Sequence, residues 1–156
     1  MKSPMKRELR LRTQRGVGIV EILVAVLVLS IGLLGLAGLQ MRTLRNNQSA
    51  LERGVAVMET HAIADAMRAD RSAAVATPSA YNIGIDDDAP SGGSTFAEAV
   101  LEGWRENLEN MLGDEATGSV NCESALCTIV IRWNDSRGSG DAATLEQLTL
   151  TTEVQL

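Results

Sequence analysis

The chain has 156 residues, of which 45% are hydrophobic and 22% are charged, a composition that argues against wholesale disorder. Residues 1–16 carry six basic side chains against Glu8, whereas residues 17–156 carry eight arginines, no lysine and 19 acidic residues. The acidic body lacks the clustered cations that nucleic acids require, so we expect no direct nucleic-acid partner.

The first expected element is a membrane-spanning helix over residues 17–39. Residues 22–39 are without charge, and a span needs roughly 20 predominantly apolar residues. Basic residues next to a span stay on the cytoplasmic side, so we expect a cytoplasmic N-terminus and residues 40–156 across the membrane. Glycine recurs at every third position from Gly32 to Gly38, which favours close helix packing but also fits ordinary span composition.

One carboxylate, Glu21, interrupts the apolar stretch that begins at Val17. An ionised carboxylate in hydrocarbon costs about 2.5 kcal/mol or more. Two explanations are open from the residues alone. Glu21 either lies close enough to the membrane surface to reach water, or it pairs with a cation of a partner, in which case each charge offsets the other's desolvation.

The residues around Gly16 do not form an ordinary secretory signal. The basic segment leads directly into the apolar stretch, and no A-x-A-like cleavage site follows. An uncleaved signal anchor is one hypothesis. However, a basic segment ending in Gly16, then four residues, then Glu21 within an apolar helix, resembles the processing site of type IV pilins and pseudopilins.

This resemblance implies that residues 1–16 are a leader, which a prepilin peptidase removes by cutting between Gly16 and Val17. The same enzyme would then methylate the amino group of Val17. The resemblance also implies that Glu21 pairs with the α-amino group of a neighbouring subunit and sets the register of a filament. The mature chains of the family usually begin with phenylalanine, so Val17 is a departure.

The helix is expected to continue beyond the span, because no proline occurs between Pro4 and Pro78. A helix over residues 17–74 would be about 85 Å long at about 1.5 Å per residue. Within 40–74, apolar residues at steps of three, four or seven predict one face that packs on a globular core. These residues are Leu44, Leu51, Val55, Met58, Ala62, Ala66, Ala69 and Ala73. His61 lies next to this face and is expected to be a surface or packing residue.

Residues 74–95 are predicted to form a loop, because prolines and paired glycines punctuate them. Its acidic run at 86–88 lacks the glycine and glutamate offsets of an EF-hand, so we expect a solvated turn. A helix over 96–112 follows, with Thr95 and Glu98 as a capping box. The apolar face of this helix is predicted to comprise Phe96, Val100, Leu101, Trp104, Leu108 and Met111.

In the last part of the chain, 118–156, apolar and polar residues alternate with a period of two, so we predict a small antiparallel sheet. Inward positions are Ile129, Ile131 and Trp133 in one strand and Leu148, Leu150, Thr152, Val154 and Leu156 in another. A short third strand is expected near 120–122, and residues 134–142 are expected to form a hairpin loop. The predicted fold class is α+β: a long N-terminal helix with a transmembrane first half, packed on a small antiparallel sheet with an extra helix, as the resemblance also implies.

The two cysteines, Cys122 and Cys127, lie in the exported part of the chain, where disulfides persist. A zinc site would need two more ligands, and a catalytic pair is more often C-x-x-C. We therefore predict a structural disulfide. We find no nucleophile elbow, phosphate loop, metal-ligand cluster or dinucleotide fingerprint, and so expect no enzyme activity, no metal and no cofactor.

Three segments narrow the resemblance to the PilV type of minor pilins, the type IV pilus modification proteins. They are "VLSIGLLGLAGLQ", "NNQSA" and "CTIVIRWND". The resemblance implies a low-abundance inner-membrane subunit with a periplasmic body. It would join other minor pilins and the major pilin on an inner-membrane assembly platform, prime assembly, occupy the pilus tip, and support twitching motility and adhesion.

Two other hypotheses remain open from the sequence. One is a minor pseudopilin of a type II secretion system, which a secretion defect on deletion would reveal. The other is a signal-anchored periplasmic protein, which would keep its N-terminus and tolerate replacement of Glu21. Within the pilin hypothesis, the loop over 74–95 is a candidate adhesive surface, and Tyr81, Phe96 and Trp133 are either contact or core residues.

Overall fold

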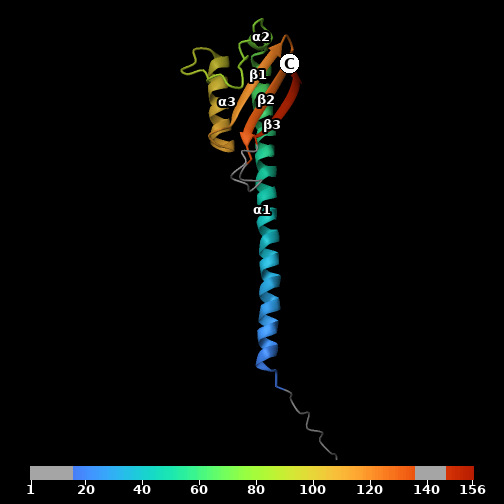
Figure 1. The fold of residues 1–156 in the computed structure, drawn as a ribbon. Helices are drawn as coiled ribbons and strands as arrows, with labels where there is room; N and C mark the ends of the chain where they lie inside the picture. Colours follow the sequence, from blue (N-terminus) through green and yellow to red (C-terminus); the bar gives the residue numbers. More distant parts are fainter. Residues whose placement is uncertain (1–15, 136–146) are drawn as a thin grey trace, which may run out of the picture. The chain divides into compact units, whose positions relative to one another are not determined.

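The computed structural model describes residues 16–135 and 147–156 (Figure 1). It comprises three helices and three strands in this order: α1 (Ile19–Ala69), α2 (Arg71–Ala74), α3 (Phe96–Leu112), β1 (Thr117–Glu123), β2 (Leu126–Asn134) and β3 (Gln147–Gln155). The chain divides into two compact units, residues 1–40 and 41–156, and α1 contributes residues to both. Most of the expected hairpin loop over 134–142 lies outside the described residues.

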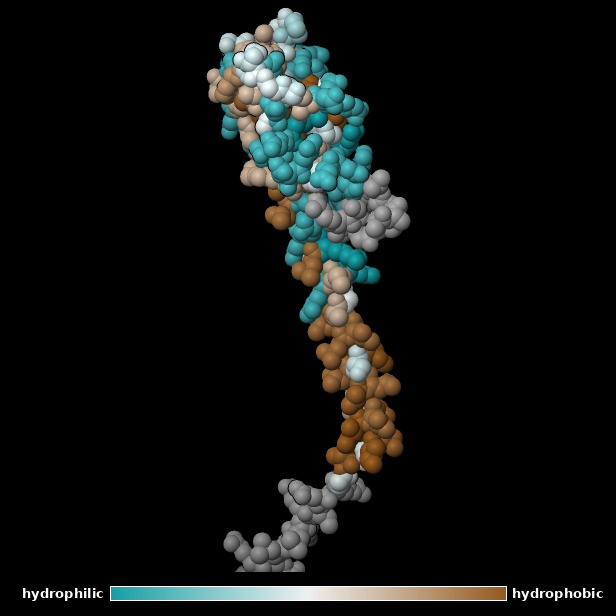
Figure 2. Space-filling view, turned by 90° about the vertical axis from the view of Figure 1, so that its left-hand side faces the viewer, coloured by the Kyte–Doolittle hydropathy of each residue, from teal (hydrophilic) through white to brown (hydrophobic). Residues whose placement is uncertain are grey.

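In the first unit, every described side chain is exposed. Hydrophobic residues cover this part of α1 on all sides that Figure 2 displays, where they appear brown. The helix is long and apolar enough to cross a membrane. The one hydroxyl among residues 19–40 is satisfied within the helix, because Ser30 Oγ donates to the carbonyl oxygen of Val26 at 2.7 Å. The structure thus supports a single span or signal anchor in this region.

The long helix ends earlier than predicted, at Ala69 instead of residue 74. Asp70 leaves the helical conformation, with φ −112° and ψ 49°, and the short helix α2 begins after it. The carbonyl oxygen of Asp70 accepts from the amides of Ala73 and Ala74, both at 3.1 Å. Its carboxylate accepts from the Tyr81 hydroxyl at 3.4 Å, so the break is held by a contact distant in sequence.

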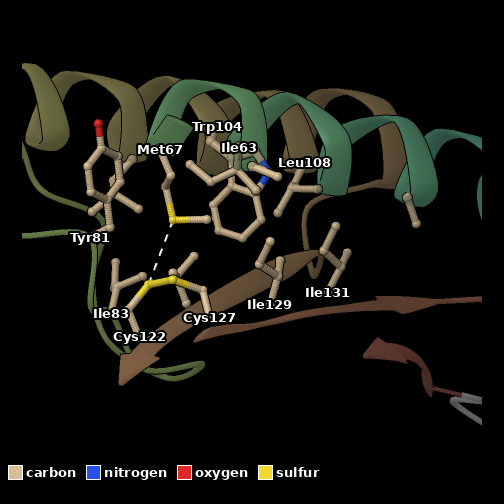
Figure 3. Close-up of a cluster of buried hydrophobic side chains, with 14 of the residues drawn as sticks. Ile63, Met67, Tyr81, Ile83, Trp104, Leu108, Cys122, Cys127, Ile129 and Ile131 are labelled. Atoms are coloured by element: carbon tan, nitrogen blue, oxygen red, sulfur yellow. Dashed lines mark hydrogen bonds between the residues drawn. A yellow bond between two sulfur atoms is a disulfide. The ribbon is translucent and has the colours of Figure 1, made fainter. Parts of the chain in front are cut away.

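In the second unit, helices lie on one face of the sheet. Figure 3 shows Ile63 and Met67 of α1 beside Trp104 and Leu108 of α3, all above the inward side chains of β2. The sheet is antiparallel with the order β1-β2-β3. The inward positions that the period of two predicted for β2 are confirmed: Ile129, Ile131 and Trp133 are buried. This is the coarse α+β arrangement that the sequence predicts.

The predicted packing face of α1 is wrong. Leu44, Leu51 and Met58, expected in the core, are 66%, 63% and 51% exposed. The buried positions instead lie on a neighbouring face, about a quarter turn away: Glu52, Ala56, Glu59, Thr60, Ile63, Ala64 and Met67. That face is mixed in polarity, but its small alanines let α3 and the sheet approach closely, and some of its polar groups are hydrogen-bonded. The Thr60 hydroxyl, for example, donates to the carbonyl oxygen of Ala56 at 2.9 Å.

Helix α3 has the predicted bounds and the predicted capping box. The Glu98 amide donates to Thr95 Oγ1 at 3.2 Å, and the Thr95 amide donates to Glu98 Oε2 at 3.0 Å. The hydrogen bonds that the backbone amides of Thr95 and Ser94 donate to the Glu98 carboxylate lower the pKa of this carboxyl. The predicted apolar face is wrong at both ends, since Phe96 and Met111 are 58% and 49% exposed. The neighbouring residues Ala97 and Leu112 are buried in their place, because α3 is rotated toward the sheet.

Strand β1 is longer than the predicted 120–122 and pairs with β2 from Thr117 to Glu123. The two strands are joined by a two-residue turn whose first residue, Ser124, has a φ of 60°. Tight hairpin turns of this kind match the twist of the strands. Cys122 and Cys127 face each other across this hairpin and form a disulfide.

The disulfide is buried at the bottom of the core, where Met67 Sδ lies 3.9 Å from Cys122 Sγ (dashed line in Figure 3). A disulfide sulfur carries no proton, so this approach is a packing contact. We expect the double substitution Cys122→Ser with Cys127→Ser to lower the free energy of unfolding by about 2 kcal/mol, because the short closed loop is lost from the unfolded state. Urea unfolding of the full chain in detergent measures this. An unchanged midpoint would contradict a stabilising role.

Candidate functional site

The candidate processing site precedes α1. Gly16 and Val17 are exposed and outside the helix. Helical hydrogen bonding starts at Gly18, whose carbonyl oxygen accepts from the amides of Glu21 at 3.0 Å and Ile22 at 3.2 Å. The peptide bond between Gly16 and Val17 therefore lies in accessible, non-helical backbone, which a peptidase needs to bind its substrate.

Glu21 lies in the first turn of α1, close to the cut predicted after Gly16. The N-terminal end of a helix carries a partial positive charge that favours a nearby carboxylate, which adds a small stabilisation. Among the described residues, neither an ion pair nor a side-chain hydrogen bond is found for Glu21. Within residues 16–135 and 147–156, the structure thus leaves this carboxylate without a partner.

Two further features of α1 are unoccupied in the single chain. A Cβ placed on Gly32, Gly35 or Gly38 would meet nothing within 4 Å, so no described residue fills the space beside these glycines. The second feature is an exposed apolar strip in the second unit, which we call the α1 stripe: Leu44, Leu51, Val55, Met58 and Ala62. Val55 alone among these is partly buried.

A groove between α1 and α3 was missed by the sequence analysis. Its lining is mostly apolar and contains one carboxylate, and its volume is about 260 Å³. We call it the α1–α3 groove and define it by Glu59, Ala62, Ile63, Ala99, Val100, Gly103, Trp104 and Asn107. The sequence contains one indication that Glu59 is buried: it lies three residues after Ala56 and four before Ile63, which places all three on one face of the helix. This spacing is informative only once that face is known to be buried.

Glu59 is the electrostatic centre of this groove. Only 5% of the residue is exposed, and burial raises the pKa of its carboxyl. Its backbone carbonyl accepts from the indole Nε1 of Trp104 at 3.2 Å, which ties α3 to α1. Among the described residues, no hydrogen bond or ion pair is found for its carboxylate.

The acidic run after residue 85 is used in local structure. Asp87 Oδ2 accepts from the Gly84 amide at 2.7 Å, and Asp86 forms an ion pair with Arg132 at 2.8 Å. The guanidinium of buried Arg105 donates to Thr117 Oγ1 and, at 2.7 Å, to the Gly84 carbonyl oxygen. Desolvation lowers the pKa of Arg105. These contacts hold the segment after α2 against α3 and β1.

The remaining candidates divide between core and surface. Tyr81 and Ile83, from the loop proposed as an adhesive surface, are buried, and Ile83 pairs with Val120 through two backbone hydrogen bonds of 2.9 and 3.0 Å. Trp104 and Trp133 are core residues, whereas Phe96 is exposed. His61 is exposed on α1, as expected.

In the part of the chain that the structure describes, no group of three or more His, Cys, Asp or Glu side chains could hold a metal ion. Comparison with protein-family models, curated proteins and solved structures finds no match to this chain. The candidate sites are therefore the segment Gly16–Glu21, the α1 stripe and the α1–α3 groove, all of which are suited to protein contacts.

Proposed function

We propose that the protein is a minor pilin of a type IV pilus, of the PilV type, which primes filament assembly and lies at the pilus tip. The observation that carries this proposal is the spacing of Gly16 and Val17, which precede α1, from Glu21 in its first turn. The accessible peptide bond, the carboxylate in the first helical turn and the exposed apolar helix occur in the order that prepilin processing and filament packing require.

The α1 stripe supports the same proposal. A monomeric soluble domain rarely leaves a row of large apolar side chains exposed unless they mark an interaction site. Leu44, Leu51 and Met58 continue the apolar surface of α1 beyond the span and into the second unit. In a filament, this row would pack against the helices of other minor pilins or of the major pilin.

In the proposed mechanism, the leader 1–16 keeps the N-terminus in the cytoplasm until the prepilin peptidase cuts after Gly16. The new α-amino group of Val17 can then be methylated. The assembly platform in the inner membrane would bring subunits together, and Glu21 would be neutralised by the α-amino group of a neighbour. The body over 40–156 would remain periplasmic until the filament carries it outside.

The first experiment is to determine the N-terminal residue and mass of the protein from membranes, with and without the prepilin peptidase. We expect a chain that starts at Val17 and carries one added methyl group, only when the peptidase is present. A chain that starts at Met1 in both strains would reject the pilin and pseudopilin proposals together and favour a signal anchor. Deletion of the protein separates the two filament systems: loss of pili would indicate a type IV pilus, and loss of secretion would indicate a type II secretion system.

A further inference from the structure

The α1–α3 groove combines apolar walls with one buried carboxylate that has no cationic partner in the described chain. Two arginines of the same helices are used elsewhere. Arg105 donates to Gly84 and Thr117, and Arg68 pairs with Asp65 at 2.7 Å. A buried charge is ordinarily paired or hydrogen-bonded, because desolvation without compensation is costly. A cation that enters the groove would meet this unpaired carboxylate.

The walls of the groove suit the stem of a long basic side chain. Ala62, Ala99 and Gly103 are small, and a Cβ placed on Gly103 would meet nothing within 4 Å. Lysine and arginine place their methylene groups along apolar surfaces while their charged ends reach polar groups. A cavity of about 260 Å³ has room for one such side chain.

The surface around the groove indicates that a protein supplies this cation. Ala62 belongs both to the groove and to the α1 stripe, so the two surfaces are continuous. On α3, Phe96 and Met111 are exposed and lie at helical spacing from Ala99 and Gly103, on the same side of the helix. A small organic cation would not need this apolar surround, whereas a protein partner would cover it.

We propose that the α1–α3 groove receives a lysine or arginine side chain of a partner protein, whose charged end pairs with Glu59. The apolar residues next to this side chain on the partner would cover Met58, Ala62 and Phe96. The inference uses only the geometry of the second unit, so it stands or fails separately from leader processing and from the role of Glu21.

A side-chain mimic tests the chemistry of the groove. The full chain in detergent micelles is titrated with n-butylguanidinium, n-butylammonium or uncharged n-butanol, and NMR follows the indole N–H of Trp104. We expect both cations to shift this signal, and Glu59→Gln to weaken their binding about fivefold or more, as for a partly buried ion pair. The matched control Glu153→Gln, at an exposed position on β3, should not change binding. Equal binding of n-butanol, or no effect of Glu59→Gln, would overturn the proposal.

Crosslinking in native membranes tests the partner itself. A benzophenone amino acid at exposed Ala99 is photoactivated, and the crosslinked peptides are sequenced. We expect a partner segment with a lysine or arginine within one helical turn of the crosslink. Its yield should fall at least severalfold with Glu59→Gln and with Gly103→Leu, which fills the groove. Glu153→Gln should leave it unchanged.

Misfolding would not explain such a loss. Burial disfavours the charged form of Glu59, so its uncharged isostere is expected to be at least as stable as the parent chain. Leucine also favours helix more than glycine does, by roughly 1 kcal/mol. Crosslinks that persist in both variants, that reach only lipid, or that fall in segments without a basic residue would each overturn the proposal.

Discussion

Replacing Glu21 with alanine is expected to abolish incorporation into filaments while leaving the protein processed and in the membrane. The substitution removes a carboxylate whose presence in hydrocarbon costs about 2.5 kcal/mol or more, so membrane insertion should improve. In the proposed filament, however, it leaves the α-amino group of a neighbour buried and unpaired. Breaking a buried ion pair in this way costs about 3–5 kcal/mol. We therefore expect a loss on the order of a hundredfold in the protein recovered with sheared pili.

The matched control for this experiment is Ser30→Ala. Ser30 is a polar residue in the same span, but its hydroxyl is bonded within its own helix, to the carbonyl oxygen of Val26. Its removal should change neither processing nor recovery with pili. Normal incorporation of the Glu21→Ala protein would contradict the assembly role and leave proximity to the membrane surface as the explanation for this carboxylate.

The elements of the second unit whose pattern is local were predictable. Strand β2 alternates strictly between buried and partly exposed residues, and α3 begins at a capping box that involves only Thr95 and Glu98. The disulfide was predicted from two cysteines in a domain that the sequence predicts to be exported. In each case, the residues that define the element lie within a few positions of one another, so the sequence contains the full signal.

The packing face of α1 was not predictable in the same way. A search for apolar spacing selects Leu44, Leu51 and Met58, because these are the largest hydrophobic side chains on one face. The sheet and α3 instead pack where Ala56, Ala64 and Met67 allow close approach, although Glu52 and Glu59 lie among them. Only tertiary contacts, such as the bond from Trp104 to the Glu59 carbonyl, show that this mixed face is buried.

The candidate sites also differ in whether a local sequence pattern is enough to predict them. Gly16, Val17 and Glu21 form a linear pattern, which a sequence displays without any folding. The α1–α3 groove joins residues about 40 positions apart, and the charge of Glu59 becomes unusual only when its burial is known. The exposed α1 stripe has a similar origin, since the same residues would be core if the helix were rotated by about a quarter turn.

The largest effect on stability is expected for Trp104→Ala. The indole is buried between the two helices and the sheet, and its ring fills the space that a Cβ at Gly118 of β1 would need. Its Nε1 also donates to the Glu59 carbonyl oxygen at 3.2 Å. Truncating a buried tryptophan costs about 3–5 kcal/mol, through lost burial and the cavity that remains. Because domains are stable by only about 5–15 kcal/mol, we expect a large fall in the urea midpoint of the full chain in detergent.

Two variants show whether this effect comes from packing between the helices and the sheet. Trp104→Phe keeps most of the ring and removes only the indole donor, while the Glu59 carbonyl keeps its helical hydrogen bond, so it should cost less, about 0.5–1.5 kcal/mol. Phe96→Ala removes an aromatic ring from the same helix at an exposed position, where substitutions usually change stability by no more than about 0.5 kcal/mol. If Phe96→Ala were as destabilising as Trp104→Ala, α3 would have to pack on the sheet through the neighbouring face that carries Phe96, which would also change the α1–α3 groove.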